Sequence, residues 1–69
     1  MKIELREEEY QGQWRVTASA KKGDQLIECS HILGPDLFAH PNEKMSTYFK
    51  NYTRNVVTRE VIEAYYSEE

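Results

Sequence analysis

The chain has 69 residues, a formal net charge of −3 and a single cysteine, Cys29. A chain this short has room for one core, so we expect one small domain over residues 1–69 without an intrachain disulfide. The acidic balance argues against a general nucleic-acid binder, and the lack of a roughly 20-residue apolar run or an apolar N-terminal stretch predicts a cytoplasmic protein with no membrane contact.

Apolar residues alternate with polar ones over the first half of the chain, which predicts three β-strands at about residues 2–9, 13–21 and 25–33. Gly12 and Gly23 fall in the short segments between them, where tight turns need a residue that tolerates positive φ. Two short turns between three strands predict an antiparallel meander.

The second of these strands has the clearest alternation. Trp14 is expected to anchor the core at one end, and the small side chains of Ala18 and Ala20 leave space for a bulky element to approach. The third strand has apolar residues on both faces, and we expect a bulge near His31 to account for this change of phase.

The second half of the chain has helical spacing. A helix is expected over about residues 43–66, with Asn42 as its N-cap. Leu37 and Phe38 lie in an irregular segment before it and are expected to close over the core. The predicted fold class is therefore α+β, a three-stranded antiparallel β-meander packed by a C-terminal helix.

The apolar residues of this helix form two arcs instead of one stripe. The N-terminal arc is expected to pack on the sheet and comprises Met45, Tyr48, Phe49, Tyr52 and Val56. The C-terminal arc lies roughly 130° away, at about 100° per residue, and comprises Val61, Ile62, Tyr65 and Tyr66. Either the helix breaks at residues 56–58, which are β-branched and modest helix formers, and both arcs cover the core, or it continues and the C-terminal arc faces outward.

We predict a non-enzymatic protein-interaction module. Exposed aromatic residues on a small domain usually mark an interface, and a symmetric homodimer is the commonest assembly. A regulator, inhibitor or subunit of bacterial or phage type fits a chain of this size without catalytic motifs. The predicted partner-binding residues are Val61, Ile62, Tyr65, Tyr66, Lys50 and Arg54.

Nucleic-acid binding through a local basic patch is the alternative function. Basic side chains can contact phosphates while neighbouring tyrosine rings stack on bases. The residues predicted for this role are Lys21, Lys22, Lys44, Lys50 and Arg54. Such binding would weaken steeply with salt.

Four side chains of types that bind zinc lie close together in the sequence: Cys29, His31, Asp36 and His40. A Cys–His pair is also the minimum for thiolate catalysis. Their spacing matches no established metal motif, and no helix N-terminus or oxyanion hole is predicted around the thiol. We therefore expect no metal, no cofactor and no catalytic site.

The segment Gly12–Val16, followed by a lysine turn, a third strand and a helix, resembles the three-stranded arm-binding domains of phage-type integrases. The resemblance covers the first half of the chain and implies a sheet that enters the major groove of DNA. Such a sheet needs a basic open face, whereas the first strand here carries Glu4, Glu7 and Glu9.

Overall fold

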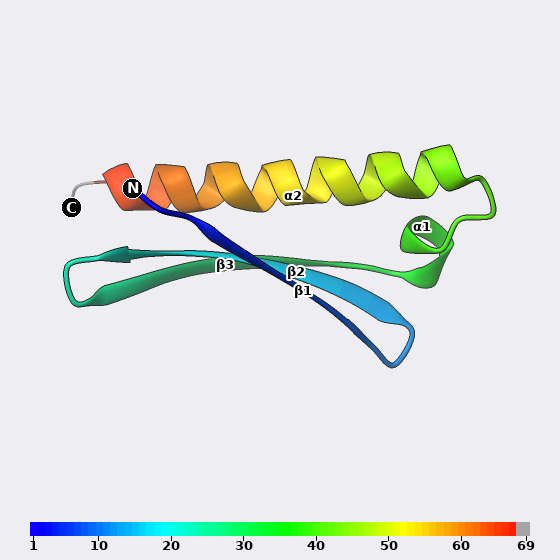
Figure 1. Cartoon of the computed structure of the whole chain (residues 1–69), viewed down its shortest axis with the longest axis horizontal. Coiled ribbons are helices and arrows are strands. Elements are labelled where there is room, and N and C mark those ends of the chain that lie inside the picture. The colour runs from blue at the N-terminus through cyan, green and yellow to red at the C-terminus, as the bar shows by residue number, and fades with distance from the viewer. Residues whose placement is uncertain (68–69) are drawn as a thin grey trace.

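The computed structural model describes residues 1–67. An open sheet of three antiparallel strands carries a long helix along one face, in an elongated body of 42 × 21 × 19 Å (Figure 1). This confirms the predicted α+β fold. The elements in chain order are β1 (Glu4–Tyr10), β2 (Gln13–Lys22), β3 (Gln25–Leu33), α1 (Pro35–Phe38) and α2 (Glu43–Tyr66). Within the described residues, no helix is both long and apolar enough to cross a membrane.

Both hairpin turns have two residues and the positive φ angles that suit twisted strands. Gln11 and Gly12 have φ of 52° and 76°, so the β1–β2 turn is of type I′. Gly23 has a φ of 64° and opens the β2–β3 turn, which is typical of type II′. The two turns place β2 at the centre of the sheet, with β1 and β3 as its edges.

β2 and β3 pair without interruption along the whole length of β3. The expected bulge near His31 is therefore wrong, because this residue follows the regular register. The apolar residues simply occupy both faces of the strand. Ile27 and Leu33 pack against the core under the helix, whereas Leu26 and Ile32 are exposed on the open face.

α2 is one uninterrupted helix of 24 residues, so the break at residues 56–58 does not occur. Packing of this helix against the sheet outweighs the modest propensity of the β-branched residues. The hydroxyl of Thr58 donates a hydrogen bond to the carbonyl of Arg54 at 2.8 Å, which satisfies this polar group within the helix. As predicted, the side chain of Asn42 caps α2 and accepts from two backbone N–H groups of its first turn.

α1 is a single helical turn where an irregular segment is expected. Pro35 begins it, and the fixed φ of proline suits the first position of a helix. The N–H groups of Leu37 and Phe38 both donate to the carbonyl of Gly34 at 3.0 Å. Phe38 is buried, so the expected closure of this segment over the core is confirmed.

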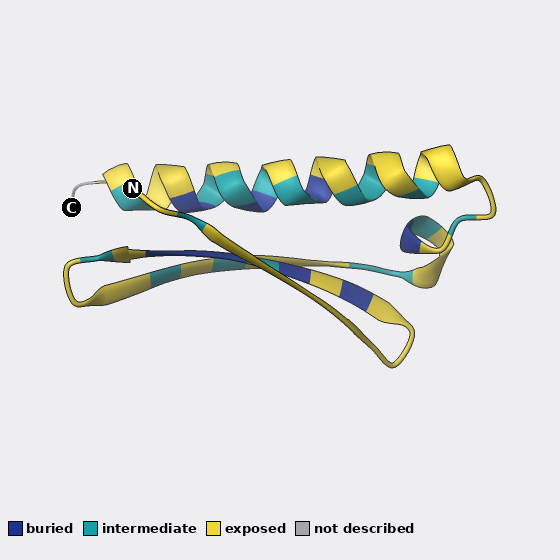
Figure 2. Ribbon diagram, in the orientation of Figure 1, coloured by how far each residue is buried: buried dark blue, intermediate teal, exposed yellow. Residues whose placement is uncertain are grey.

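The core lies between α2 and β2, with α1 closing one end (Figure 2). Thr53, Val57 and Val61 are the buried positions of α2. The buried apolar residues are Trp14, Val16, Ala18, Ala20, Phe38, Val57 and Val61. The anchoring role predicted for Trp14 is thus confirmed.

The prediction that the N-terminal arc packs on the sheet is wrong for most of its residues. Tyr48 and Tyr52 are 60% and 57% exposed, and Met45 is exposed as well. The physical reason is the rotation of the helix about its axis. The buried positions of α2 are Thr53, Val57 and Val61, and at about 100° per residue Tyr48 and Tyr52 lie more than about 90° around the helix from that line.

Candidate protein-interaction surface

An apolar groove runs between β3 and α2, at the sheet edge opposite β1. Its volume is about 340 Å³, and it is larger than two hollows of about 280 and 220 Å³ elsewhere on the surface. β3, α1 and α2 all contribute to its walls, and we call it the β3–α2 groove. The lining residues are His31, Ile32, Leu33, Leu37, Phe49, Tyr52, Thr53 and Val56.

The N-terminal arc of the helix belongs to this groove. Phe49, Tyr52 and Val56 line it, and the ring of Tyr48 stacks on that of Tyr52 with centroids 6.3 Å apart. Three of the five residues of the arc predicted for the core therefore form a partly exposed wall along the groove. Exposed apolar surface of this kind is typical of a site that binds a partner.

The two edges of the sheet differ strongly in charge. Five of the seven residues of β1 are charged, and charged side chains on an edge discourage pairing with another strand. β3 has nine residues and carries no lysine, proline or glycine. Its one carboxylate, Glu28, already meets Arg6 of β1 at 3.3 Å. β3 is therefore the less protected edge.

The register shows which backbone groups of β3 point away from the sheet. A two-residue turn is closed by a hydrogen-bonded pair, and hydrogen-bonded and non-hydrogen-bonded pairs then alternate along the ladder. Counting from Lys22 opposite Gln25, every second residue of β3 directs its N–H and C=O away from β2. These residues are Leu26, Glu28, Ser30 and Ile32.

The C-terminal arc does not form one surface. Val61 is 0% exposed and lies in the core, so its predicted contact with a partner is wrong. Tyr65 is half-buried and packs against the core, with the Lys22 ammonium 5.3 Å from its ring centroid. Of the four residues only Ile62 and Tyr66 are exposed. The cause is that α2 is one continuous helix. Val61 follows Val57 by four residues, so the two share a face, and both pack toward the sheet.

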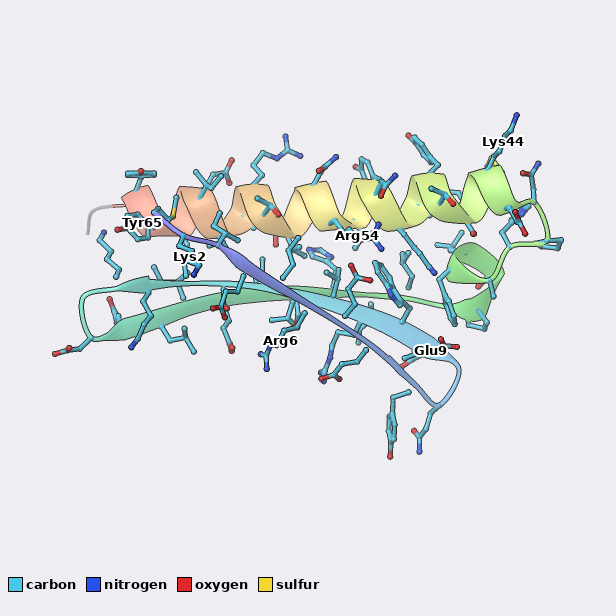
Figure 3. All side chains as sticks on the ribbon, viewed as in Figure 1. Lys2, Arg6, Glu9, Lys44, Arg54 and Tyr65 are labelled. Carbon is cyan, nitrogen blue, oxygen red and sulfur yellow. The ribbon has the colours of Figure 1, made fainter. Side chains whose placement is uncertain are left out.

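Lys50 and Arg54, the basic residues predicted for partner contact, cover Trp14. The Lys50 ammonium and the Arg54 guanidinium lie 5.7 and 5.4 Å from the indole centroid, within cation–π range. Arg54 points from α2 toward the sheet (Figure 3). Its Nε and Nη2 donate to the two carboxylate oxygens of Glu7 at 2.6 and 3.0 Å, a bidentate pair that joins α2 to β1.

This pair makes the stability depend on pH. The hydrogen bond from Arg54 is the main cause that lowers the pKa of Glu7 from its ordinary value of 4.5. Because the folded-state pKa is the lower one, the pair stabilises the fold above the ordinary pKa, and this contribution is lost as the pH falls through the folded-state value. We expect Glu7→Gln to lower the free energy of unfolding by about 0.5–1 kcal/mol at neutral pH and by much less in acid, in urea titrations followed by circular dichroism.

Glu8→Gln is the matched control for this prediction. Glu8 meets Arg15 through one contact of 3.0 Å between two exposed side chains, so its loss should cost less. An effect of Glu7→Gln that is the same in acid as at neutral pH would show that Arg54 does not hold the Glu7 carboxylate in the folded state.

The residues predicted for nucleic-acid binding are spread along the length of the molecule. Lys44 lies at the N-terminal end of α2, and Tyr65 lies at the opposite end (Figure 3). Lys22 is at the Tyr65 end, where it donates to the backbone carbonyl of that residue at 2.5 Å. Lys21 is its exposed neighbour on β2. Lys22 and Lys44 therefore lie at opposite ends of the fold, and nucleic-acid binding through these basic residues stays a prediction.

Cys29 and His31 share the helix-facing side of β3. The Nε2 atom of His31 lies 3.1 Å from a carboxylate oxygen of Glu60. Burial and, next, the Glu60 carboxylate raise the pKa of the Cys29 thiol, which makes it a weak nucleophile at neutral pH. His40 accepts a hydrogen bond from the backbone of Asn42. Among residues 1–67, no group of three His, Cys, Asp or Glu side chains is placed to hold a metal ion.

The β3–α2 groove and its open edge are the features that the sequence predictions missed. The signal for them is the composition of β3, which has apolar residues on both faces and little charge, beside the highly charged β1. The site is thus defined by its geometry alone. Comparison of the chain with protein-family models, curated proteins and solved structures found no match.

Proposed function

We propose that the protein is a non-enzymatic interaction module that binds an extended segment of a protein chain at the β3 edge. The segment adds to the sheet as a fourth strand, and its alternate side chains enter the β3–α2 groove. The protein acts in this way as a regulator, inhibitor or subunit. The observation that carries the proposal is an apolar groove directly beside an open strand edge of low charge.

The chemistry of the site favours a segment with apolar residues at every second position. In strand addition, main-chain hydrogen bonds supply affinity and pockets for alternate side chains supply specificity. Ser30 and Ile32 direct backbone groups outward beside the part of the groove that Leu33, Phe49 and Val56 line. A partner strand bonded there would place one face of its side chains between β3 and α2.

A proline in the β3 edge tests the proposal. Ser30→Pro removes an outward-pointing N–H, and edge strands tolerate proline where this group faces solvent. Immobilised wild-type chain should retain a protein from a lysate of its native host that the variant does not retain. The retained protein, which can be a second copy of this chain, is then purified and titrated. Ser30→Pro should weaken its binding at least about tenfold.

Glu9→Pro is the matched control at the other edge. Because Tyr10 opposite Gln13 closes the first turn, the N–H of Glu9 also points away from β2. This variant should bind as the wild type does. If Ser30→Pro fails to fold, Leu37→Ser is the substitute test, because it changes the groove wall without altering a strand. This variant should also weaken binding. Equal binding by wild type, Ser30→Pro and Leu37→Ser would refute strand addition at β3.

A further inference from the structure

We infer that the strand added at the β3 edge is β3 of a second copy of this chain. The product is a two-fold symmetric dimer with a continuous six-stranded sheet, in which the two β3 strands run antiparallel with Cys29 of both copies at the two-fold axis. The inference rests on the proposed function, because it names the partner of the same edge.

Backbone direction restricts how β3 can pair with itself. Antiparallel strands form a ladder only where outward-pointing residues face each other, so the axis must pass through a residue and not between two. An axis at Cys29, the middle residue of β3, pairs all four outward-pointing residues of each copy. Leu26 then lies opposite Ile32 of the second copy, and Glu28 opposite Ser30.

The side chains in this register are complementary. Leu26 and Ile32 are 58% and 54% exposed on the open face, and dimerisation would set each against the other. The carboxylate of Glu28 faces a hydroxyl and keeps its own Arg6, so no like charges are opposed. On the helix side, Ile27 of the second copy lies opposite His31, a residue of the β3–α2 groove.

The position of α2 also suits this assembly. The helix packs on β2 and β3 to a similar extent, so its axis lies above the boundary between these strands. Neighbouring strands are about 4.8 Å apart, which places each helix about one strand spacing from the two-fold axis. Two helices in the dimer would then lie about 10 Å apart, close to the usual separation of packed helices. The second helix would run along the flank of α2 that carries Tyr52 and Val56.

A charge exchange across the axis tests both the dimer and its register. Leu26 and Ile32 are six residues apart in one strand, too far to pair within a chain, but they face each other between copies. The variant Leu26→Lys with Ile32→Lys should dissociate the dimer, whereas Leu26→Lys with Ile32→Glu should restore opposite charges at each contact. We expect Kd values for the two variants that differ at least about tenfold in analytical ultracentrifugation, with unchanged circular dichroism because both positions are exposed.

The outcomes separate this inference from the proposed function. A wild-type chain that stays monomeric at about 1 mM, where a weak dimer would be detected, overturns the inference. The proposed function survives that result if another protein binds the wild type but not Ser30→Pro. A dimer with equal Kd for the Lys/Lys and Lys/Glu variants also overturns the inference, because the Cys29-centred register would then be absent.

Discussion

Replacing Trp14 with alanine is expected to remove a large part of the free energy that keeps the molecule folded. The indole is buried at one end of the core and is covered by Lys50 and Arg54. Removal of a buried tryptophan costs about 3–5 kcal/mol, whereas a chain of this length is stable by roughly 3–10 kcal/mol in total. Urea unfolding followed by circular dichroism measures the loss without relying on indole fluorescence.

Trp14→Phe is the control for this large effect. The smaller ring still fills part of the space and still offers a face to the two cations, so we expect a loss well below that of alanine. A decrease of less than about 1 kcal/mol for Trp14→Ala, smaller than the usual cost of truncating a buried aromatic residue, would show that the indole does not anchor the core.

Val61→Asp is expected to abolish folding, although Val61 belongs to the arc predicted to contact a partner. Val61 lies on α2, and its side chain is fully buried in the core. A buried carboxylate without a partner is among the most destabilising changes known. We expect a loss of about 4 kcal/mol or more, visible as the absence of a cooperative unfolding transition in thermal or urea titrations.

Ile62→Asp is the matched control, one residue further along the same helix. Ile62 is 37% exposed, so its carboxylate would reach water, and the loss should stay near 1 kcal/mol or below. Both substitutions place the same charge in the C-terminal half of α2, so the unfavourable effect of the helix dipole is common to them. Similar losses for the two variants would contradict the helix orientation described above.

Local patterns in the sequence predict the elements of this fold well. The third strand and the long helix have the expected bounds, 25–33 and 43–66, because alternation, turn glycines and the Asn42 cap are all local signals. The face that the helix buries is harder to predict. It depends on how the helix is rotated over strands that are remote in sequence, with Thr53, Val57 and Val61 turned inward, and a helical wheel contains no such information.

The candidate site was less predictable than the fold for the same reason. The groove needs β3, α1 and α2 to meet, and its lining residues come from both sides of the Gly34 turn. The helical pattern predicts Tyr52 in the core because its apolar ring counts toward the helical stripe, although its hydroxyl and size favour the surface. The sequence predicts partner contact for Lys50 and Arg54 because it does not show the indole of Trp14 beneath them.

β1 is attached to the rest of the molecule far more weakly than its place in the sheet suggests. All seven of its residues are exposed, it has one neighbouring strand, and Glu7 joins it to α2 through Arg54. Segments with few buried contacts open locally at a lower free energy than the whole domain. The amide protons of β1 should therefore exchange with solvent deuterium before those of α2, as expected for a stable β2–β3–α2 unit from which the first strand detaches on its own.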